Sequence, residues 1–477
     1  VWAARARGDI FVSTAYSVTA ALIFAPLLWE VTLRFKVLPA EAAAAVLVGF
    51  MALASALAWK RNLTTITLVV STCSVVTALI LMIATRRPAG FIVALVAMAL
   101  ISEVSPSRER WSRAVVPAVC DLALLVLLSI YTDSSGLSQE YRPLPSVFLL
   151  TIVWVFFLIY AAVTAYCTLS LRQEIGYFEI AQTVVAFLLA FIGTLRVSYH
   201  TAAPWLGVFC LAGAIGAYAP LIRFQHRFQL QPWTYHVFAT WAVALSLIGV
   251  LLTFPAGISA TLWGVAALVA ILLSMRTGRL TPAFHAVIYI AAAVLASGLL
   301  GYGGRALIGN LPPALNWQVT LTASLAIAAY FVSAQIFGPS SRHEISLRNT
   351  RDEWKRQLQR ICVCVIMVFA ILVLLVDLLA AIVSQVTALD PPLMAILRTV
   401  ALSLTALGLA LAGARWQRSE LVWTGYAVIA FCTLKLLFED IRNGTAVSIA
   451  VSFFVYGMVW VLVPRIIRMW QRHTGKA

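Results

Sequence analysis

Charged residues are scarce in this chain. Of its 477 residues only 11% are charged, whereas 62% are hydrophobic, and the mean hydropathy is +0.95. A soluble globular protein is about half apolar and about one quarter charged. The composition therefore excludes a soluble globule and indicates a protein embedded in lipid.

Cysteine and histidine are also few, with seven and six residues, and they are scattered. Most cysteines stand singly in apolar runs, which is typical of small core residues and excludes a disulfide framework. Cys362 and Cys364 form a C-x-C without nearby histidine, and no two histidines have metal-ligand spacing. We expect no metal and no cofactor. No basic tract with interleaved aromatic residues is present, so we expect no nucleic-acid partner.

Long apolar segments recur along the whole chain. Each is long enough, as a helix, to cross about 30 Å of hydrocarbon. They predict an all-α integral membrane protein with about sixteen transmembrane helices and short loops. The predicted spans are 10–30, 40–59, 63–84, 89–104, 114–131, 146–170, 177–198, 204–222, 233–253, 257–275, 281–301, 316–337, 361–388, 391–413, 420–438 and 445–464.

The distribution of basic residues predicts the orientation of these spans. Lysine and arginine concentrate in the cytoplasmic loops of membrane proteins. With both termini cytoplasmic, 24 of the 34 basic residues lie on that side. The ten on the outer side are Arg34, Lys36, Arg86, Arg87, Arg142, Arg196, Arg305, Arg398, Lys435 and Arg442. We therefore expect a multi-pass protein of a bacterial cytoplasmic (inner) membrane with both ends inside.

The longest connection, 338–360, differs from the other loops. It separates helices 1–12 within 1–337 from helices 13–16 and a basic cytoplasmic tail within 361–477. Thr350 to Glu353 has the capping-box pattern, and apolar residues recur at helical spacing amid basic ones. One interpretation is an amphipathic cytoplasmic helix that lies on anionic phospholipids through Arg351, Trp354, Lys355, Arg356 and Arg360. The alternative is a helical linker that continues the next span.

Basic turns suggest an internal repeat. They occur at Lys60-Arg61, at 172–174, at 276–279 and at 415–418, each between two apolar helices and all on the predicted cytoplasmic side. Four duplicated four-helix units would produce this pattern. Independent Ala/Leu-rich hairpins with basic turns would produce it equally well.

Few charged side chains lie within the predicted spans, and each is costly by roughly 3 kcal/mol. Asp377 lies near the middle of its predicted span and is the strongest functional candidate. With Arg398 and Lys435, from the next two spans, it could surround a polar site or permeation path. The alternative is a packing ion pair of Asp377 with Arg398 or Lys435. Lys435 could also pair with Glu439, four residues along the same helix.

Two further features concern other spans. Asp121 lies about two turns inside the fifth span, and the same pairing hypothesis applies to it with Arg196. The sequence Gly-Tyr-Gly-Gly at 301–304 is interpreted as part of an outer loop, where glycine usually makes turns. The chain begins at Val1 rather than Met, so we expect that a segment precedes it.

The C-terminal region resembles a large bacterial family. The matching stretches are Glu420 to Asp440, with its Lys435-x-x-x-x-Asp440 element, then Ser452 to Gly457 and Pro464-Arg465. They are similar to the end of a family of polytopic predicted membrane proteins whose domain has no assigned function. The resemblance implies a helical membrane fold and a bacterial origin, and it transfers no catalytic residue.

Three functions fit these observations. The first is an accessory or scaffold subunit of a larger membrane assembly, without catalysis of its own and with other membrane subunits as partners. The second is a transporter or flippase for an amphipathic cell-envelope metabolite. The third is a membrane-embedded glycosyl- or acyltransferase, for which the motivation is Glu30 at the outer end of the first span.

The predicted orientation can be tested by cysteine labelling. Single cysteines introduced near Lys355 and after Pro464 should react with an impermeant maleimide from the cytoplasmic side only, because basic segments stay on that side. Labelling from opposite faces would show that the predicted threading is wrong.

Overall fold

The computed structural model is helical throughout the residues that it describes. These are 10–61, 64–104, 110–132, 141, 144–170, 175–223, 232–277, 279–308, 316–336, 350–441 and 444–473. Residues 1–9, 337–349 and 474–477 are among those that lie outside them. The described residues divide into two compact units, Val1–Leu206 with Tyr218–Phe238, and Gly207–Ala217 with Ala239–Ala477.

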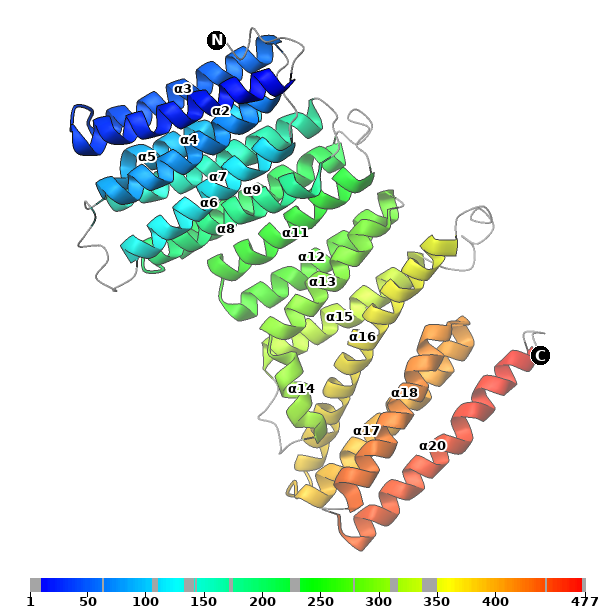
Figure 1. Cartoon of the computed structure of the whole chain (residues 1–477). Coiled ribbons are helices and arrows are strands. Elements are labelled where there is room, and N and C mark those ends of the chain that lie inside the picture. The colour runs from blue at the N-terminus through cyan, green and yellow to red at the C-terminus, as the bar shows by residue number, and fades with distance from the viewer. Residues whose placement is uncertain are drawn as a thin grey trace. The chain divides into compact units, whose positions relative to one another are not determined.

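Unit 1 is a stack of antiparallel helices (Figure 1). Helix α2 packs on α4, α3 packs on α4 and α5, and α6 and α7 both pack on α8. Its core lies between these helices and includes Leu47, Phe91, Leu124 and Phe156, all fully buried. The bounds are α2 Ile10–Trp29, η1 Glu30–Arg34, α3 Ala40–Arg61, α4 Thr64–Thr85, α5 Pro88–Val104, α6 Arg110–Thr132, α7 Ser146–Leu169 and α8 Tyr177–Val197.

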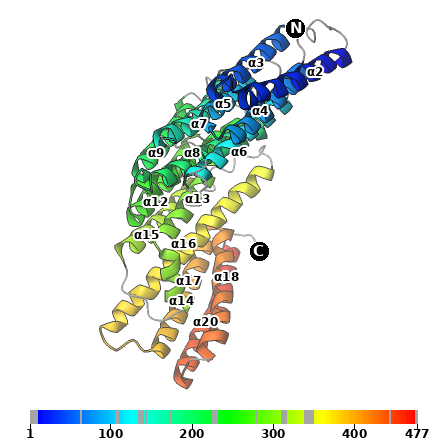
Figure 2. The same ribbon diagram turned by 60° about the vertical axis from the view of Figure 1, so that its left-hand side comes forward.

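Unit 2 contains the C-terminal helices, and α9 and α11 are each divided between the units. Helix α12 packs on α13 and α15, α16 packs on α14, α15 and α17, and α17 packs on α18 and α20 (Figure 2). The bounds are α9 Ala203–Arg223, α11 Pro232–Thr253, α12 Ala256–Thr277, α13 Leu280–Ala296, α14 Leu299–Ile308, α15 Trp317–Ile336, α16 Thr350–Ser384, α17 Pro391–Trp416, α18 Ser419–Lys435, η4 Leu436–Asp440 and α20 Ala446–His473.

Each predicted span except the eleventh, 281–301, coincides with one helix or with a helix and its π-helical turn. Among the described residues, thirteen helices are long and apolar enough to cross a membrane, and the bent pair α13 and α14 makes up to fourteen. Pro88–Glu103 and Ala203–Ala219 are shorter apolar helices. The architecture is that of a polytopic helical membrane protein. The number of crossings and the fourfold repeat stay predictions.

The helices expose many large apolar side chains and bury many alanines. Leu22, Ile215 and Phe454 are each about two thirds exposed or more, although they lie within apolar helices. Ala43, Ala58 and other alanines are fully buried between helices. Lipid tails solvate leucine as well as a protein core does, so small residues that allow close helix contact favour association in a membrane. The arrangement therefore fits helices surrounded by lipid.

The predicted eleventh span is broken, and the loop interpretation of residues 301–304 is wrong. Helix α13 ends at Ala296, and α14 continues after a bend of 66°. Gly298 between them has φ +73°, a conformation that glycine adopts without a steric cost. Residues 301–304 belong to α14, because the chain turns at 297–298 and resumes helical hydrogen bonding.

Helix α16 is continuous from Thr350 to Ser384, so its N-terminal part is an extension of the span. This supports the linker alternative over a separate interfacial helix. The predicted start at Thr350 agrees with the structure. Residues 338–349 lie outside the described part, and lipid contact by the basic segment stays a prediction.

Gly298 offers a test of the broken helix. The substitution Gly298→Ala should lower the free energy of unfolding by about 1 kcal/mol or more, because a Cβ disfavours positive φ even where space is open. Gly301 is the matched control, since its Cβ would also meet open space but its backbone is helical. Gly301→Ala should be neutral or stabilising by up to about 1 kcal/mol. Unfolding in detergent micelles measures both, and equal effects would contradict the role of the bend.

Candidate functional site: charges at the ends of four helices

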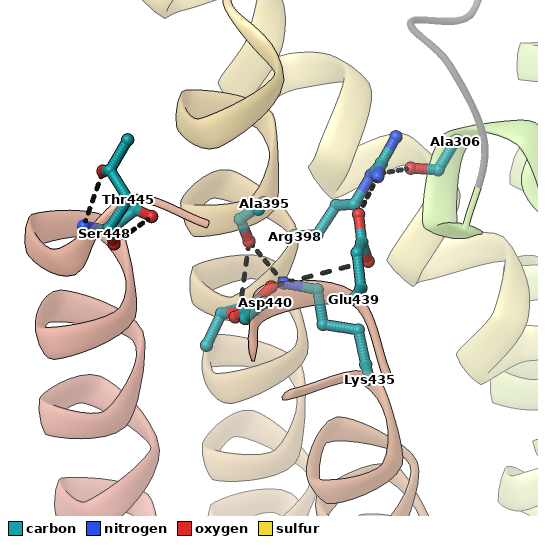
Figure 3. A network of polar contacts seen from close by, with 9 residues as sticks. Ala306, Ala395, Arg398, Lys435, Glu439, Asp440, Thr445 and Ser448 are labelled. Atoms are coloured by element: carbon teal, nitrogen blue, oxygen red, sulfur yellow. Dashed lines mark hydrogen bonds and ion pairs between the residues drawn. The ribbon is translucent and has the colours of Figure 1, made fainter. Parts of the chain in front are cut away.

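Four charged side chains converge in unit 2. Arg398 from α17, Lys435 from α18, and Glu439 and Asp440 from η4 form a group that we call the charge cluster (Figure 3). Arg398 is 4% exposed, Lys435 6% and Asp440 1%. Two cations and two carboxylates make the cluster formally neutral. Buried charges are tolerated in a membrane when they are paired in this way.

The Lys435 ammonium is fully hydrogen-bonded. Its Nζ donates to Asp440 Oδ1 at 2.5 Å, to Thr399 Oγ1 at 2.8 Å and to the Ala395 carbonyl oxygen at 2.6 Å. An ammonium has three donors, so none is left for a ligand. The Thr399 hydroxyl also lies 3.3 Å from Asp440 Oδ2. These contacts connect the C-terminal end of α18 to α17.

The π-helical turn η4 explains why Lys435 pairs with the fifth residue after it. In this turn the backbone bonds run from residue i to i+5, as in Ile441 N–H to Leu436 O. The wider turn brings Asp440 next to Lys435, while Glu439 Oε2 remains 4.0 Å from Lys435 Nζ. The predicted Lys435–Glu439 proximity is confirmed, but Asp440 is the closer carboxylate. The sequence spacing of an ordinary helix could not predict this.

Arg398 connects α17 to the short helix α14. Its Nε donates to the carbonyl oxygen of Ala306 at 2.7 Å, and its Nη1 pairs with Glu439 Oε1. The last four carbonyls of a helix have no partner within that helix, and Ala306 lies among them in α14. A cation is also favourable at this negative end of the helix dipole. Arg398 therefore caps the broken half of the bent pair.

Asp377 on α16 contacts the same short helix. The Tyr302 hydroxyl of α14 donates to Asp377 Oδ1 at 2.6 Å. Gly303 permits the close approach, because a Cβ there would meet Phe369 Cζ of α16 at 2.4 Å. Thus α14 supplies a hydroxyl to Asp377 and a carbonyl to Arg398, within one unit. The sequence signal for these partners was the glycine pattern around Tyr302, which we had assigned to a loop.

The structure corrects the predicted partners of Asp377. Arg398 pairs with Glu439, and Lys435 pairs with Asp440, so neither of these ion pairs involves Asp377. Helix α16 also ends at Ser384, which places Asp377 about two turns from its end instead of mid-span. The three predicted residues do lie on adjacent helices, α16, α17 and α18. Their pairing was wrong, and a common polar site formed by the three stays a prediction.

The predicted Asp121–Arg196 pair is also wrong. Asp121 Oδ2 on α6 accepts a hydrogen bond from Gln182 Nε2 at 2.8 Å. Gln182 and Arg196 lie near opposite ends of α8, about 20 Å apart along its axis, so Arg196 cannot reach the same carboxylate. Arg196 is exposed at the far end of that helix.

The remaining candidates are at helix ends. Glu30 pairs with Arg34 at 3.3 Å on the exposed turn η1, which continues the first helix. Trp354 and Lys355 are exposed near the start of α16, and Arg356 and Arg360 are partly exposed. The side chain of Arg351 lies outside the described part.

Comparisons with known proteins add no relative: the chain matches no protein-family model, no curated protein and no solved structure. The resemblance of the C-terminal region to a bacterial membrane family stays a prediction. The site must therefore be interpreted from its own geometry.

A double-mutant cycle tests the pairing of Lys435 with Asp440. Lys435→Met or Asp440→Leu alone should lower the free energy of unfolding by about 3 kcal/mol, because each leaves one buried charge uncompensated. The double substitution should cost clearly less than the sum. Arg34→Met, at the exposed Glu30–Arg34 pair, is the control and should cost at most about 1 kcal/mol. Additive single effects in denaturant titrations would contradict the pairing.

Proposed function

We infer that this protein is a membrane transporter or flippase for an amphipathic cell-envelope metabolite, with its polar site beside the broken helix α14. The observation that carries the proposal is that α14 offers Tyr302 to Asp377 and the Ala306 carbonyl to Arg398. Secondary transporters build binding sites from discontinuous helices of this kind, whose free backbone groups meet polar ligands inside the membrane.

Spare hydrogen-bonding capacity at this place supports a ligand. Glu439 Oε2 is buried and has no hydrogen-bond partner among the described residues. Asp377 is partly buried, and Tyr302 contacts one of its two oxygens. A carboxylate has about four acceptor positions, so both groups can accept further donors. Ionisable groups within a membrane span are functional candidates by default.

The position of the site supports an amphipathic substrate. Asp377 and Arg398 each lie about two turns from the ends of their helices, and Glu439 lies at the end of η4. A polar headgroup at this depth would meet charge, while an apolar tail would remain at the level of the hydrocarbon. With both termini in the cytoplasm of a bacterial cell, these helix ends face the outer side of the inner membrane.

The basic N-terminal residues of α16 fit the same orientation, in which this end of the helix lies at the cytoplasmic face. Trp354 is 64% exposed and Lys355 is exposed beside it. An exposed aromatic ring next to basic residues is typical of the headgroup region. We assign Trp354, Lys355, Arg356 and Arg360 to contact with anionic phospholipids on the cytoplasmic face.

An accessory or scaffold subunit is the second candidate. The observation that favours it is the saturated Lys435 ammonium, whose donors all bind groups of the same chain. Such a network fixes helix packing without any ligand. The transferase hypothesis gains no such support, because Glu30 is engaged with Arg34 on the exposed surface.

Accessibility from both faces distinguishes transport from a scaffold role. In a background without native cysteines, Asp377→Cys should react with an impermeant cationic thiosulfonate in right-side-out and in inside-out vesicles. Alternating access exposes a transport site to each side in turn. The reaction is measured by a shift in mass or by blocked maleimide labelling.

Ala370→Cys is the matched control on the same helix. Ala370 is fully buried, two turns before Asp377, and should react from neither side. Reaction of Asp377→Cys no faster than that of Ala370→Cys would exclude a water-accessible path at this site. Reaction from one side only would favour the scaffold interpretation.

A further inference from the structure

Unit 1 contains a small polar cavity, separate from the transport site proposed in unit 2. It lies between the ends of α5, α7 and α8 and has a volume of about 50 Å³. Its polar lining comes from Glu103, Tyr160, Thr164, Thr168, Glu179 and Gln182. A water-sized site needs only about 15 Å³, so the cavity has room for one small ion with a water molecule.

An unsatisfied hydroxyl lies in the wall of this cavity. Tyr160 is only 3% exposed, and its hydroxyl has no hydrogen-bond partner among the described residues. The ring itself is held edge-on against Phe156, with the centroids 5.0 Å apart. An unpaired buried hydroxyl costs about 1–3 kcal/mol, which a ligand at this point would recover.

Other lining groups present oxygen atoms. The Thr168 hydroxyl donates to the Thr164 carbonyl at 2.7 Å, so its lone pairs remain for a ligand. Gln182 is 4% exposed, and its amide nitrogen donates to Asp121. The carbonyl oxygen of the Gln182 amide is therefore left to bind a ligand. An array of oxygen acceptors is suited to a hard cation.

The surrounding charge is negative. Asp121 lies behind Gln182, and its Oδ1 is buried with no hydrogen-bond partner in the described part of the chain. Glu179 lines the cavity itself. A cation in the cavity would compensate this charge in a medium of low dielectric constant.

We propose that this cavity binds a sodium ion through the oxygens of Tyr160, Thr168, Glu179 and Gln182, with Asp121 as the charge behind them. A monovalent ion fits better than a divalent one. Among the described residues no three acidic, histidine or cysteine side chains cluster in the way that a carboxylate-rich divalent site requires. Divalent sites depend on several carboxylates, whereas neutral oxygens predominate here.

Sodium-dependent stability tests the proposal on the full chain in detergent. The unfolding temperature is measured at constant ionic strength in sodium, potassium and N-methylglucamine chloride. We expect a saturable increase with sodium, because a ligand that binds only the folded state stabilises it. Potassium should give a smaller shift and N-methylglucamine none. Binding of radioactive sodium, displaced by unlabelled sodium, gives a second readout.

Conservative variants locate the site. Tyr160→Phe keeps the ring and removes only the hydroxyl, so it should raise the half-saturating sodium concentration about tenfold, the effect of about 1.4 kcal/mol. Glu179→Gln and Asp121→Asn should abolish the sodium effect. Tyr166→Phe is the control, because Tyr166 is exposed on the same helix and does not line the cavity.

Each other outcome would overturn the proposal. Equal stability in the three salts would show that sodium does not bind. Stability that changes with pH but not with sodium would show that the acidic groups take up protons instead. A sodium effect that persists in both Tyr160→Phe and Glu179→Gln would place the ion elsewhere. These two variants carry the test even if Asp121→Asn fails to fold.

Discussion

Polar groups inside a hydrocarbon layer have no water to bind, so the chain itself must supply their partners. Helices meet this requirement for the backbone everywhere except at their ends. The short helix α14 ends at Ile308 within unit 2, and the Arg398 side chain binds one of its last carbonyls, that of Ala306. The same contact gives a buried guanidinium a partner. The end of the short helix and the buried charge therefore satisfy each other, and this contact joins α14 to α17.

The π-helical turn has a similar role. An ordinary helix after Lys435 would direct Glu439 toward the ammonium and Asp440 away from it. The wider turn allows Asp440 to bind Lys435 and Glu439 to bind Arg398. One helix end therefore neutralises two cations that lie on the neighbouring helices α17 and α18. Single π turns inside helices occur frequently at functional sites. Here the turn directs one of two adjacent carboxylates to Arg398 of α17 and the other to Lys435 of α18.

The helices could be predicted from the sequence because their signal is one-dimensional: a run of about twenty apolar residues must form a helix in lipid. Arg398, Lys435 and Asp377 could be selected because charge is costly there. Their partners could not, since pairing depends on which helices touch. Tyr302 and Ala306 were missed because Gly301 to Gly304 suggested a loop, whereas the chain turns three residues before Gly301, at Gly298. Asp121 likewise binds Gln182 instead of the predicted Arg196, because the partner depends on which helices are in contact and not on charge alone.

The charged groups of the cluster differ in how fully their hydrogen-bonding capacity is used. A group whose donors or acceptors are all used contributes packing, and removing its partner leaves a buried charge. Lys435 is such a group, with three acceptors for three donors. Glu439 keeps one buried oxygen that has no hydrogen bond among the described residues and lies 4.0 Å from the Lys435 ammonium. A saturated pair that fixes helix packing therefore lies next to a carboxylate that can still accept a donor. Both follow from the π-helical turn, which gives each of two adjacent carboxylates a different cation.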